Sequence, residues 1–291
     1  MFIEPILLEV APDKLDLSLS VVQELKMDEV RILYSTMSSE KEPVIYTRHN
    51  NVITTSFPEL HSLGIAKGTI LDGELIYSDS YNQGKPDFEK VMSRINVKDD
   101  RKVAIPSKET PCMAVFFDIL YWKGESVMHL PLLERKRLLD LALEDQESAC
   151  KIKWSIGNGQ ELFNLAKEHS LEGIVLKNPE SRYYNKRHEA WQKKIAYLTS
   201  QVYILGLRKG KFGWLLGRKE NGRIRPAGVM EFGVSPDERK AFYQISKQII
   251  TEEDKDFIYI EPVVQCKIKY RNITSKGHFR IHVFETFIFN N

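Results

Sequence analysis

Apolar residues in this chain gather in short runs that are separated by turn-forming and charged residues, and only a few stretches show helical spacing. Short apolar runs bounded by Gly, Pro, Asn or Asp are typical of strands. The clearest strand candidates in the first two thirds of the chain are 23–35, 43–47, 68–77, 114–121 and 171–177. Helical spacing predicts helices over 87–95, 130–143, 160–169 and 236–250.

The stretch 23–35 sets Lys26, Asp28 and Arg31 among apolar residues. A lysine at the edge of a core is desolvated, and desolvation beside another cation favours the neutral amine, which is the nucleophilic form. The alternative interpretation of this stretch alone is a strand edge from which Lys26 and Arg31 reach solvent. The run 43–47 is expected to pair with it in a hairpin through the polar turn 37–42.

Single carboxylates interrupt the other strand candidates. Asp72-Gly73 predicts either a hairpin turn or a strand kinked at Gly73 that leaves Glu74 at the rim of a pocket. Asp118 lies in a dense apolar run, so it must be paired or stand at a strand end. We expect the polar stretch 96–111 to be a loop and the charged run 134–137 to be a solvated helix face.

Composition adds a division into two domains. The 291 residues are enough for two cores, and from about residue 198 the chain turns to short strands punctuated by glycine, with one helix. Residues 198–291 carry 16 Lys and Arg against 10 Asp and Glu, whereas the whole chain carries 42 against 40. Short strands on a basic background suggest a small barrel of the oligonucleotide-binding (OB) kind.

Three widely spaced cysteines, Cys112, Cys150 and Cys266, suggest neither a zinc site nor a disulfide framework. The N-terminus has no basic region, and no apolar run approaches the length of a membrane span. We therefore expect a soluble cytosolic protein.

Taken in order, the charged residues and their apolar neighbours closely resemble the nucleotidyltransferase motifs of ATP-dependent DNA ligases, above all the minimal two-domain bacterial and phage enzymes. The matching segments are Lys26-Met27-Asp28-Glu29-Val30-Arg31, Tyr46-Thr47-Arg48, Leu71-Asp72-Gly73-Glu74, Phe116-Phe117-Asp118, Leu171-Glu172-Gly173-Ile174-Val175-Leu176-Lys177 and Trp191-Gln192-Lys193. The resemblance implies an α+β fold. An ATP-grasp-like nucleotidyltransferase (adenylation) domain with antiparallel sheets would span 1–197, and an OB-fold β-barrel would span 198–291.

The resemblance implies a role for each matching residue. Lys26 would attack the α-phosphate of ATP and carry AMP as a phosphoramidate. Glu172 and Glu74 would hold Mg²⁺, or Mn²⁺ in its place, and Glu74 would also contact the ribose.

The base and the phosphates would contact other matching residues. Phe117 would stack on adenine, and Glu24 would accept a hydrogen bond from the adenine amino group. Ribose and phosphate would be contacted by Arg31, Arg48, Lys177 and Lys193. Arg31 and Arg48 would also bind the 5′-phosphate of the nick. Arg280 matches the end of the family's barrel and would contact nucleic acid.

The implied partner is nicked double-stranded DNA, clasped by a monomer that closes around it in the cytoplasm, at the nucleoid, in repair, replication or recombination. Two alternatives stay open on the sequence. One is an RNA ligase or a capping-type nucleotidyltransferase, and the other is a catalytically weakened nick-binding protein.

Three positions depart from the family's pattern. Glu29 stands where the family has glycine, and Ile195 stands where it commonly has a second lysine. The sequence also stops at Asn291 without a further basic motif that orients pyrophosphate in many relatives. For Glu29 three outcomes stay open on the sequence: slower adenylylation, a changed affinity for the nucleotide, or relief by a local shift of the backbone. The missing basic motif predicts a less efficient reaction with ATP.

Overall fold

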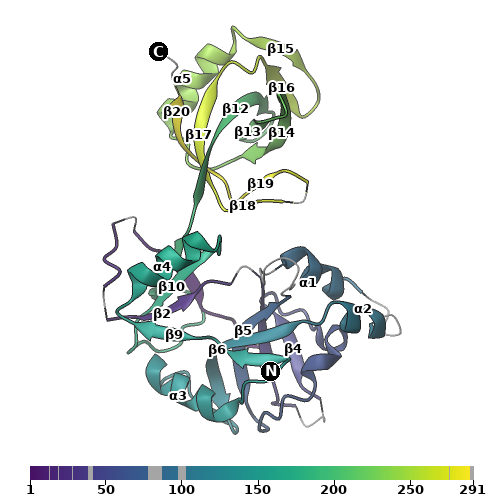
Figure 1. The fold of residues 1–291 in the computed structure, drawn as a ribbon, viewed down its shortest axis with the longest axis vertical. Helices are drawn as coiled ribbons and strands as arrows, with labels where there is room; N and C mark the ends of the chain where they lie inside the picture. Colours follow the sequence, from purple (N-terminus) through teal and green to yellow (C-terminus); the bar gives the residue numbers. More distant parts are fainter. Residues whose placement is uncertain are drawn as a thin grey trace. The chain divides into compact units, whose positions relative to one another are not determined.

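The computed structural model describes residues 1–12, 14–18, 20–27, 29–38, 42–77, 87–97, 103–274 and 276–288, with the backbone alone for 104–106. The chain divides into two compact units, Met1–Ala196 and Tyr197–Asn291, each with its own sheets and core (Figure 1).

The first unit contains two sheets. The five-stranded sheet has the order β1-β11-β10-β2-β9, and the six-stranded sheet has the order β4-β3-β5-β6-β7 with β8 paired to β6. Neighbouring strands run antiparallel except in the pairs β1–β11 and β6–β8. The strands are β1 (Leu7–Val10), β2 (Val22–Leu25), β3 (Val30–Ser35), β4 (Val44–Thr47), β5 (Ile70–Ile76), β6 (Met113–Trp122), β7 (Glu125–Ser126), β8 (Ala149–Lys151), β9 (Trp154–Ile156), β10 (Gly173–Lys177) and β11 (Arg187–Ile195).

Side chains that point alternately to the two faces of the strands form the cores of this unit. In β3, Leu33 belongs to a cluster that also contains Val22 of β2 and Trp191 of β11, so this core draws on both sheets. Ile32 and Tyr34, which alternate with Leu33, belong to a second core on the opposite face of the six-stranded sheet. The two sheets thus share one apolar layer.

Helices cover the remaining faces. Helix α3 packs on β6, and α4 packs on β10 and β2. The helices of this unit are α1 (Phe88–Ile95), α2 (Ala104–Glu109), α3 (Leu132–Ala142) and α4 (Gly159–Glu168), with short 3₁₀ turns at Thr54–Ser56 and Pro58–Leu60. The buried stripe of α3 consists of Leu132, Arg135, Lys136, Leu139 and Ala142.

Three expectations for the first unit are wrong. Helix α2 lies within the stretch 96–111 that was expected to be a loop, of which 98–102 lie outside the described residues. Arg135 and Lys136 of the run 134–137 are buried rather than solvated, because buried carboxylates on other elements pair with them. The stretch 23–35 forms two strands in different sheets rather than one.

Two other expectations are confirmed. Strands β3 and β4 pair antiparallel as the predicted hairpin, although 39–41 of its turn lie outside the described residues. Asp72-Gly73 lies inside the continuous strand β5, and the register with β6 shifts between these two residues. The kinked strand is therefore right and the hairpin turn is wrong.

The second unit is a curled antiparallel sheet, and helix α5 contributes Phe242 to its core. Strand β12 pairs with β17 through its first half and with β16 through its last residues, so it bends across two neighbours. Trp214, which is fully buried, lies in the core of this unit. The elements are β12 (Leu198–Arg208), β13 (Trp214–Glu220), β14 (Arg223–Met230), α5 (Pro236–Ser246), β15 (Ile250–Glu253), β16 (Phe257–Ile260), β17 (Gln265–Tyr270), β18 (Asn272–Ile273), β19 (Phe279–Arg280) and β20 (Val283–Ile288).

The expected α+β class, with antiparallel sheets followed by a curled barrel-like sheet of the OB kind, is confirmed. Within the described residues, no helix has both the length and the apolar character needed to cross a membrane.

Candidate active site

Lys26 lies where the chain passes from one sheet of the first unit to the other. Strand β2 ends at Leu25 in the five-stranded sheet, and β3 begins at Val30 in the six-stranded sheet. The backbone N–H of Lys26 donates to the carbonyl of Gly173 at 2.9 Å, which ties this connection to β10. Asp28 lies outside the described residues. A lysine at this crossing can present its amine to the space between the two sheets.

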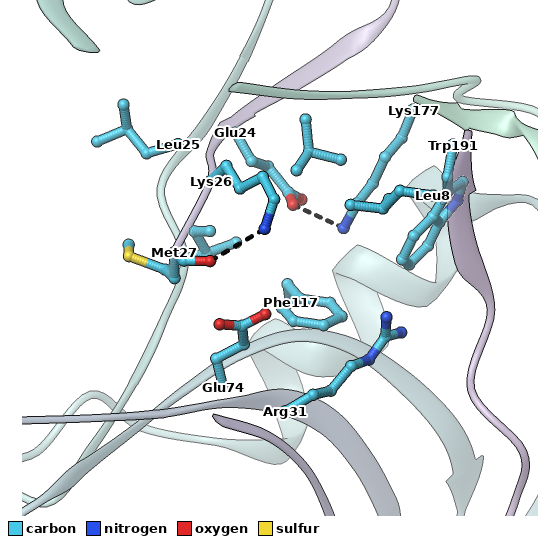
Figure 2. Close-up of a pocket in the computed structure, with 12 residues that line it drawn as sticks. Leu8, Glu24, Leu25, Lys26, Met27, Arg31, Glu74, Phe117, Lys177 and Trp191 are labelled. Atoms are coloured by element: carbon cyan, nitrogen blue, oxygen red, sulfur yellow. Dashed lines mark hydrogen bonds and ion pairs between the residues drawn. The ribbon is translucent and has the colours of Figure 1, made fainter. Parts of the chain in front are cut away.

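Most of the predicted site residues line one pocket around this amine (Figure 2). They come from both sheets, so the pocket depends on how the sheets pack. Its lining comprises Leu8, Glu24, Leu25, Lys26, Met27, Arg31, Glu74, Phe117, Ile152, Val175, Lys177 and Trp191. We call this the inner pocket. Its lining combines charged groups with apolar and aromatic side chains, a combination that is typical of small-molecule sites.

Glu172 is the acid that contacts the predicted nucleophile. Its Oε2 atom lies 2.8 Å from Nζ of Lys26, which also donates to the carbonyl of Met27 at 3.2 Å. Glu172 directly precedes β10, and Gly173 has a φ of +142°. A Cβ at Gly173 would lie 2.1 Å from the carbonyl oxygen of Lys194, so only glycine lets the backbone approach this closely.

Glu74 stands on β5 opposite Arg31 of β3. A Cβ at the preceding Gly73 would lie 2.6 Å from the carbonyl of Val115, so glycine permits the close approach at the kink. Burial raises the pKa of Glu74 to about 7; the negative charge of Glu172 adds to the rise, although Lys26 and Arg31 oppose it. The backbone N–H of Glu29 donates to Oε2 of Glu74 at 3.3 Å.

Glu24 is buried between two lysines. Its Oε2 lies 2.6 Å from Nζ of Lys177, and Nζ of Lys136 from α3 contacts its Oε1. Lys136 also donates to the carbonyl of Phe117 at 3.0 Å. Burial by itself would raise the pKa of Glu24, but the charges and hydrogen bonds of the two lysines outweigh it and hold the pKa below its usual value. Glu24 is therefore an ionised acceptor.

Phe117 and Trp191 form the aromatic part of the inner pocket. Their ring centroids are 6.1 Å apart in an edge-to-face arrangement. The Lys177 ammonium lies 4.4 Å from the Phe117 centroid and 3.9 Å from the Trp191 centroid, and the Arg31 guanidinium lies 5.1 Å from that of Phe117. Such an apolar wall beside cations suits a planar base attached to phosphates.

Asp72 holds Arg31 in place. The guanidinium donates to both Asp72 oxygens, at 2.9 and 2.6 Å, and to the carbonyl of Ile6 at 2.8 Å. The Tyr183 hydroxyl donates to Asp72 at 2.7 Å and accepts from the backbone N–H of Ile6 at 3.1 Å. This network fixes the direction of Arg31 before any ligand binds.

A second, wider cavity also reaches Lys26. We call it the outer cavity. Its lining includes the predicted residues Lys26, Arg31, Arg48, Glu74 and Lys193, and it adds Glu29, His49 and Arg187. Burial lowers the pKa of Lys193, and the positive charge of Lys26 lowers it further. Cations gathered around one cavity make it a site for anions.

Arg280, the remaining predicted residue, lies on β19 of the second unit, where its backbone carbonyl accepts from the N–H of Arg271 at 2.9 Å.

Five residues at the site were not expected there from the sequence: Lys136, Asp72, Tyr183, Arg187 and His49. For Lys136 a signal was present, because it occupies an i, i+4 position in the apolar stripe of α3 that starts at Leu132. A charged residue in such a stripe requires a buried partner. No comparable signal marks Arg187 or His49, which reach the outer cavity only through the fold.

Comparison with known proteins gives three consistent results. The family model described as "ATP dependent DNA ligase domain" matches residues 15–194. The SPbeta prophage-derived DNA ligase-like protein LigB of Bacillus subtilis is 37% identical over 289 residues, which are 98% of this chain and 99% of that protein. A DNA ligase of Methanothrix thermoacetophila is 26% identical over 251 residues, which are 81% of this chain but only 45% of that longer protein.

Solved structures share the fold. A Lig E DNA ligase superposes with a TM-score of 0.67 at 16% identity, covering 99% of this chain and 100% of that one. A mycobacterial DNA ligase D in complex with ATP and MES superposes with a TM-score of 0.56 at 22% identity, covering 98% and 95% of the two chains.

Proposed function

This chain belongs to the ATP-dependent DNA ligase family, as the sequence motifs indicate, and we propose that it seals nicks in duplex DNA through AMP carried on Lys26. The observation that carries the assignment of Lys26 is its position. Its amine stands at the junction of an aromatic-walled pocket and a cation-lined cavity, held by Glu172 at 2.8 Å. The base and sugar of ATP would occupy the first space, and its phosphates would occupy the second.

The first step is the transfer of AMP to Lys26. The side chain is 15% exposed, so water can take up the proton that its nitrogen loses as the N–P bond forms. The amine then attacks the α-phosphorus of ATP; an N–P bond forms, and the bond to the β-phosphate oxygen breaks, releasing pyrophosphate with the electron pair. Glu172 orients the amine, while Lys177, Lys193 and Arg31 supply positive charge for the phosphate oxygens.

Adenine would rest against Phe117 with its exocyclic amino group on Glu24. This placement is supported by the ionised state of Glu24, because a carboxylate can only accept. A carbonyl at the same position of the base would meet negative charge. The arrangement therefore favours ATP over GTP, which separates a DNA ligase from a guanylyl-transferring capping enzyme.

The chemistry of Glu74 and Glu172 fits a divalent cation. The two carboxylates are close enough for the charge of Glu172 to raise the pKa of Glu74, a repulsion that a cation would relieve. Among the described residues there is no group of three or more side chains that could hold a metal ion, so phosphate oxygens would complete the shell. We propose Mg²⁺, with Mn²⁺ as a substitute; when bound, it would neutralise charge on the transferring phosphate.

The later steps use DNA as the acceptor. AMP passes from Lys26 to the 5′-phosphate of a nick, and the neighbouring 3′-hydroxyl displaces AMP to form the phosphodiester. Arg48 and Arg31 line the outer cavity and would bind the 5′-phosphate there. We propose that the second unit, with its basic excess and Arg280, binds the DNA backbone, so that a monomer closes around the duplex in the cytoplasm, at the nucleoid.

Covalent labelling tests this proposal. The chain is incubated with α-labelled ATP and Mg²⁺, and then with a duplex that carries a single nick. We expect label on the protein, its loss on addition of the nick, and a sealed strand on a denaturing gel. Lys26→Ala should abolish all three, whereas the exposed control Lys153→Ala should change none of them. Label that persists in Lys26→Ala would contradict the assignment of Lys26. If the chain sealed the same nick made in RNA but not in DNA, it would be an RNA ligase.

A further inference from the structure

Lys136 contacts two residues of the inner pocket, although it lies on helix α3 and not on a strand of either sheet. Its side chain is 2% exposed and reaches both the carboxylate of Glu24 and the backbone carbonyl of Phe117. The first of these residues is the proposed acceptor for the base, and the second is the proposed stacking surface. One ammonium therefore links the two groups that would define where the base lies.

The two lysine partners of Glu24 are not equivalent. Lys177 lines the inner pocket, and its ammonium lies against the rings of Phe117 and Trp191 at distances of 4.4 and 3.9 Å. In the proposed function Lys177 also contacts phosphate oxygens, so a bound nucleotide would compete with Glu24 for its ammonium. Lys136 is held by the Phe117 carbonyl as well and has no such second task, so it is the partner that keeps Glu24 charged and oriented.

Without Lys136, Glu24 would be a buried carboxylate that depends on a partner shared with the ligand. Burial then favours the neutral acid, which carries an O–H and can donate to a carbonyl. A pocket with that acid would accept a base with a carbonyl as readily as a base with an amino group.

We propose that Lys136 sets the base selectivity of the nucleotide site by holding Glu24 as a charged, oriented acceptor for an exocyclic amino group. Lys136 is thus a positioning residue that acts through Glu24. This inference rests on the proposed function, because it concerns the same nucleotide site.

The test compares ATP with inosine triphosphate (ITP), whose base carries a carbonyl oxygen where adenine carries its amino group. The kcat/KM for formation of the covalent adduct is measured with each nucleotide in the full chain. We expect Lys136→Met to lower the ATP-to-ITP ratio at least about tenfold, because ATP loses its acceptor and ITP gains a donor. Lys136→Arg, which keeps the charge, should retain the ratio within about threefold. The matched control is Arg137→Met, one residue further along α3 and exposed, and it should leave both rates unchanged.

A double-mutant cycle separates selectivity from folding. Glu24→Gln presents both a donor and an acceptor, so its ATP-to-ITP ratio should be low already. Glu24→Gln leaves the buried ammonium of Lys177 without its carboxylate, whether or not Lys136 is present. Because Lys136 then has no carboxylate to hold, adding Lys136→Met should cause no further change in the ratio. This second pair keeps the inference testable if Lys136→Met alone does not fold.

Three outcomes would overturn the inference. In the first, Lys136→Met lowers kcat/KM equally for ATP and ITP. In the second, Lys136→Met changes the ATP-to-ITP ratio as much in the Glu24→Gln background as in the wild type, and in the third, the wild type does not distinguish the two nucleotides. A chain that forms no adduct with any nucleotide would instead contradict the proposed function. The two failures are therefore distinguishable.

Discussion

Nζ of Lys26 lies 2.8 Å from Oε2 of Glu172, and the two side chains are only 15% and 6% exposed. Because this largely buried ion pair holds the proposed nucleophile, we expect the first step to depend on Glu172. Glu172→Gln keeps the shape of the side chain and removes its charge, so the amine would lose its partner and the proposed cation would lose a ligand. We expect adduct formation to slow on the order of 100-fold.

The measurement is the rate of covalent labelling at saturating ATP over a range of Mg²⁺ concentrations. Glu168→Gln, an exposed acid in the last turn of α4, serves as the control and should have no effect. A Glu172→Gln rate within threefold of the wild type at every Mg²⁺ concentration would show that this acid is not needed.

Arg135 and Asp118 form an ion pair whose expected contribution is to the stability of the fold, because both side chains are fully buried. The guanidinium of α3 donates to the two carboxylate oxygens of β6 at 2.8 and 2.9 Å. Arg135→Met would leave the Asp118 charge buried without its partner, and we expect a loss of about 3–5 kcal/mol in the free energy of unfolding. Urea unfolding measures this loss.

Two further variants define the origin of that loss. Adding Asp118→Asn to Arg135→Met removes the unpaired charge, so the double variant should lose less than Arg135→Met alone. Lys153→Met, at a side chain that is 93% exposed, should cost less than about 0.5 kcal/mol. A double variant that is no more stable than Arg135→Met alone would mean that the lost contacts of Arg135 with the carbonyls of Leu130 and Ser181 dominate, rather than the unpaired charge of Asp118.

The same buried pairs mark the limit of what the sequence could predict. Short apolar runs located most strands, and the order of the acids and bases located the pocket. Arg135 and Lys136 were misread because their partners, Asp118 and Glu24, are 17 and 112 residues away. A run of charges on a helix is usually solvated, and only the tertiary position of those acids reverses that preference. The passage of the chain between two sheets at Lys26 likewise depends on pairing between distant strands, which local spacing does not encode.

Gly173 tests how tightly the strand with Glu172 is fixed. A Cβ there would meet the carbonyl oxygen of Lys194 at 2.1 Å, and φ is +142°. We expect Gly173→Ala to lower the free energy of unfolding by about 2–4 kcal/mol, since the backbone itself must move. Gly210→Ala is the matched control, because Gly210 has a φ of +79° but nothing within 4 Å of a Cβ, so only about 1 kcal/mol of backbone strain is expected. Equal losses in the two variants would contradict a steric origin.

Lys177 gives nucleotide binding a dependence on pH. Burial lowers the pKa of its ammonium to about 8; the charge of Lys136 adds to the lowering, although Glu24 opposes it. Phosphate oxygens would favour the charged form, so binding above pH 8 requires uptake of a proton. We therefore expect the Kd for ATP to rise with pH above about 8, by up to about tenfold for each pH unit.

Binding of ATP is measured without metal by calorimetry between pH 7 and 9.5, in buffers of different ionisation enthalpy that report proton uptake. Lys177→Met should bind ATP more weakly at pH 7 and lack this dependence. Equal slopes in the wild type and Lys177→Met would assign the titration to another group, such as Lys193, whose pKa is also lowered.

Glu29 stands where the family has glycine, and its side chain lines the outer cavity together with Lys26, Arg48 and Lys193. Its contact with Glu74 is made by the backbone N–H, which a glycine would keep. What the glutamate adds is volume and negative charge in a cavity that we propose receives phosphates.

Glu29→Gly should therefore speed adduct formation, because the triphosphate no longer faces a like charge. We expect a gain of about fivefold in kcat/KM for ATP, equivalent to about 1 kcal/mol of removed repulsion. Glu29→Gln separates the two contributions: a gain equal to that of Glu29→Gly assigns the effect to charge, and a smaller gain assigns it to volume. If neither variant is faster than the wild type, Glu29 does not slow this reaction, and a weak wild type would need another cause.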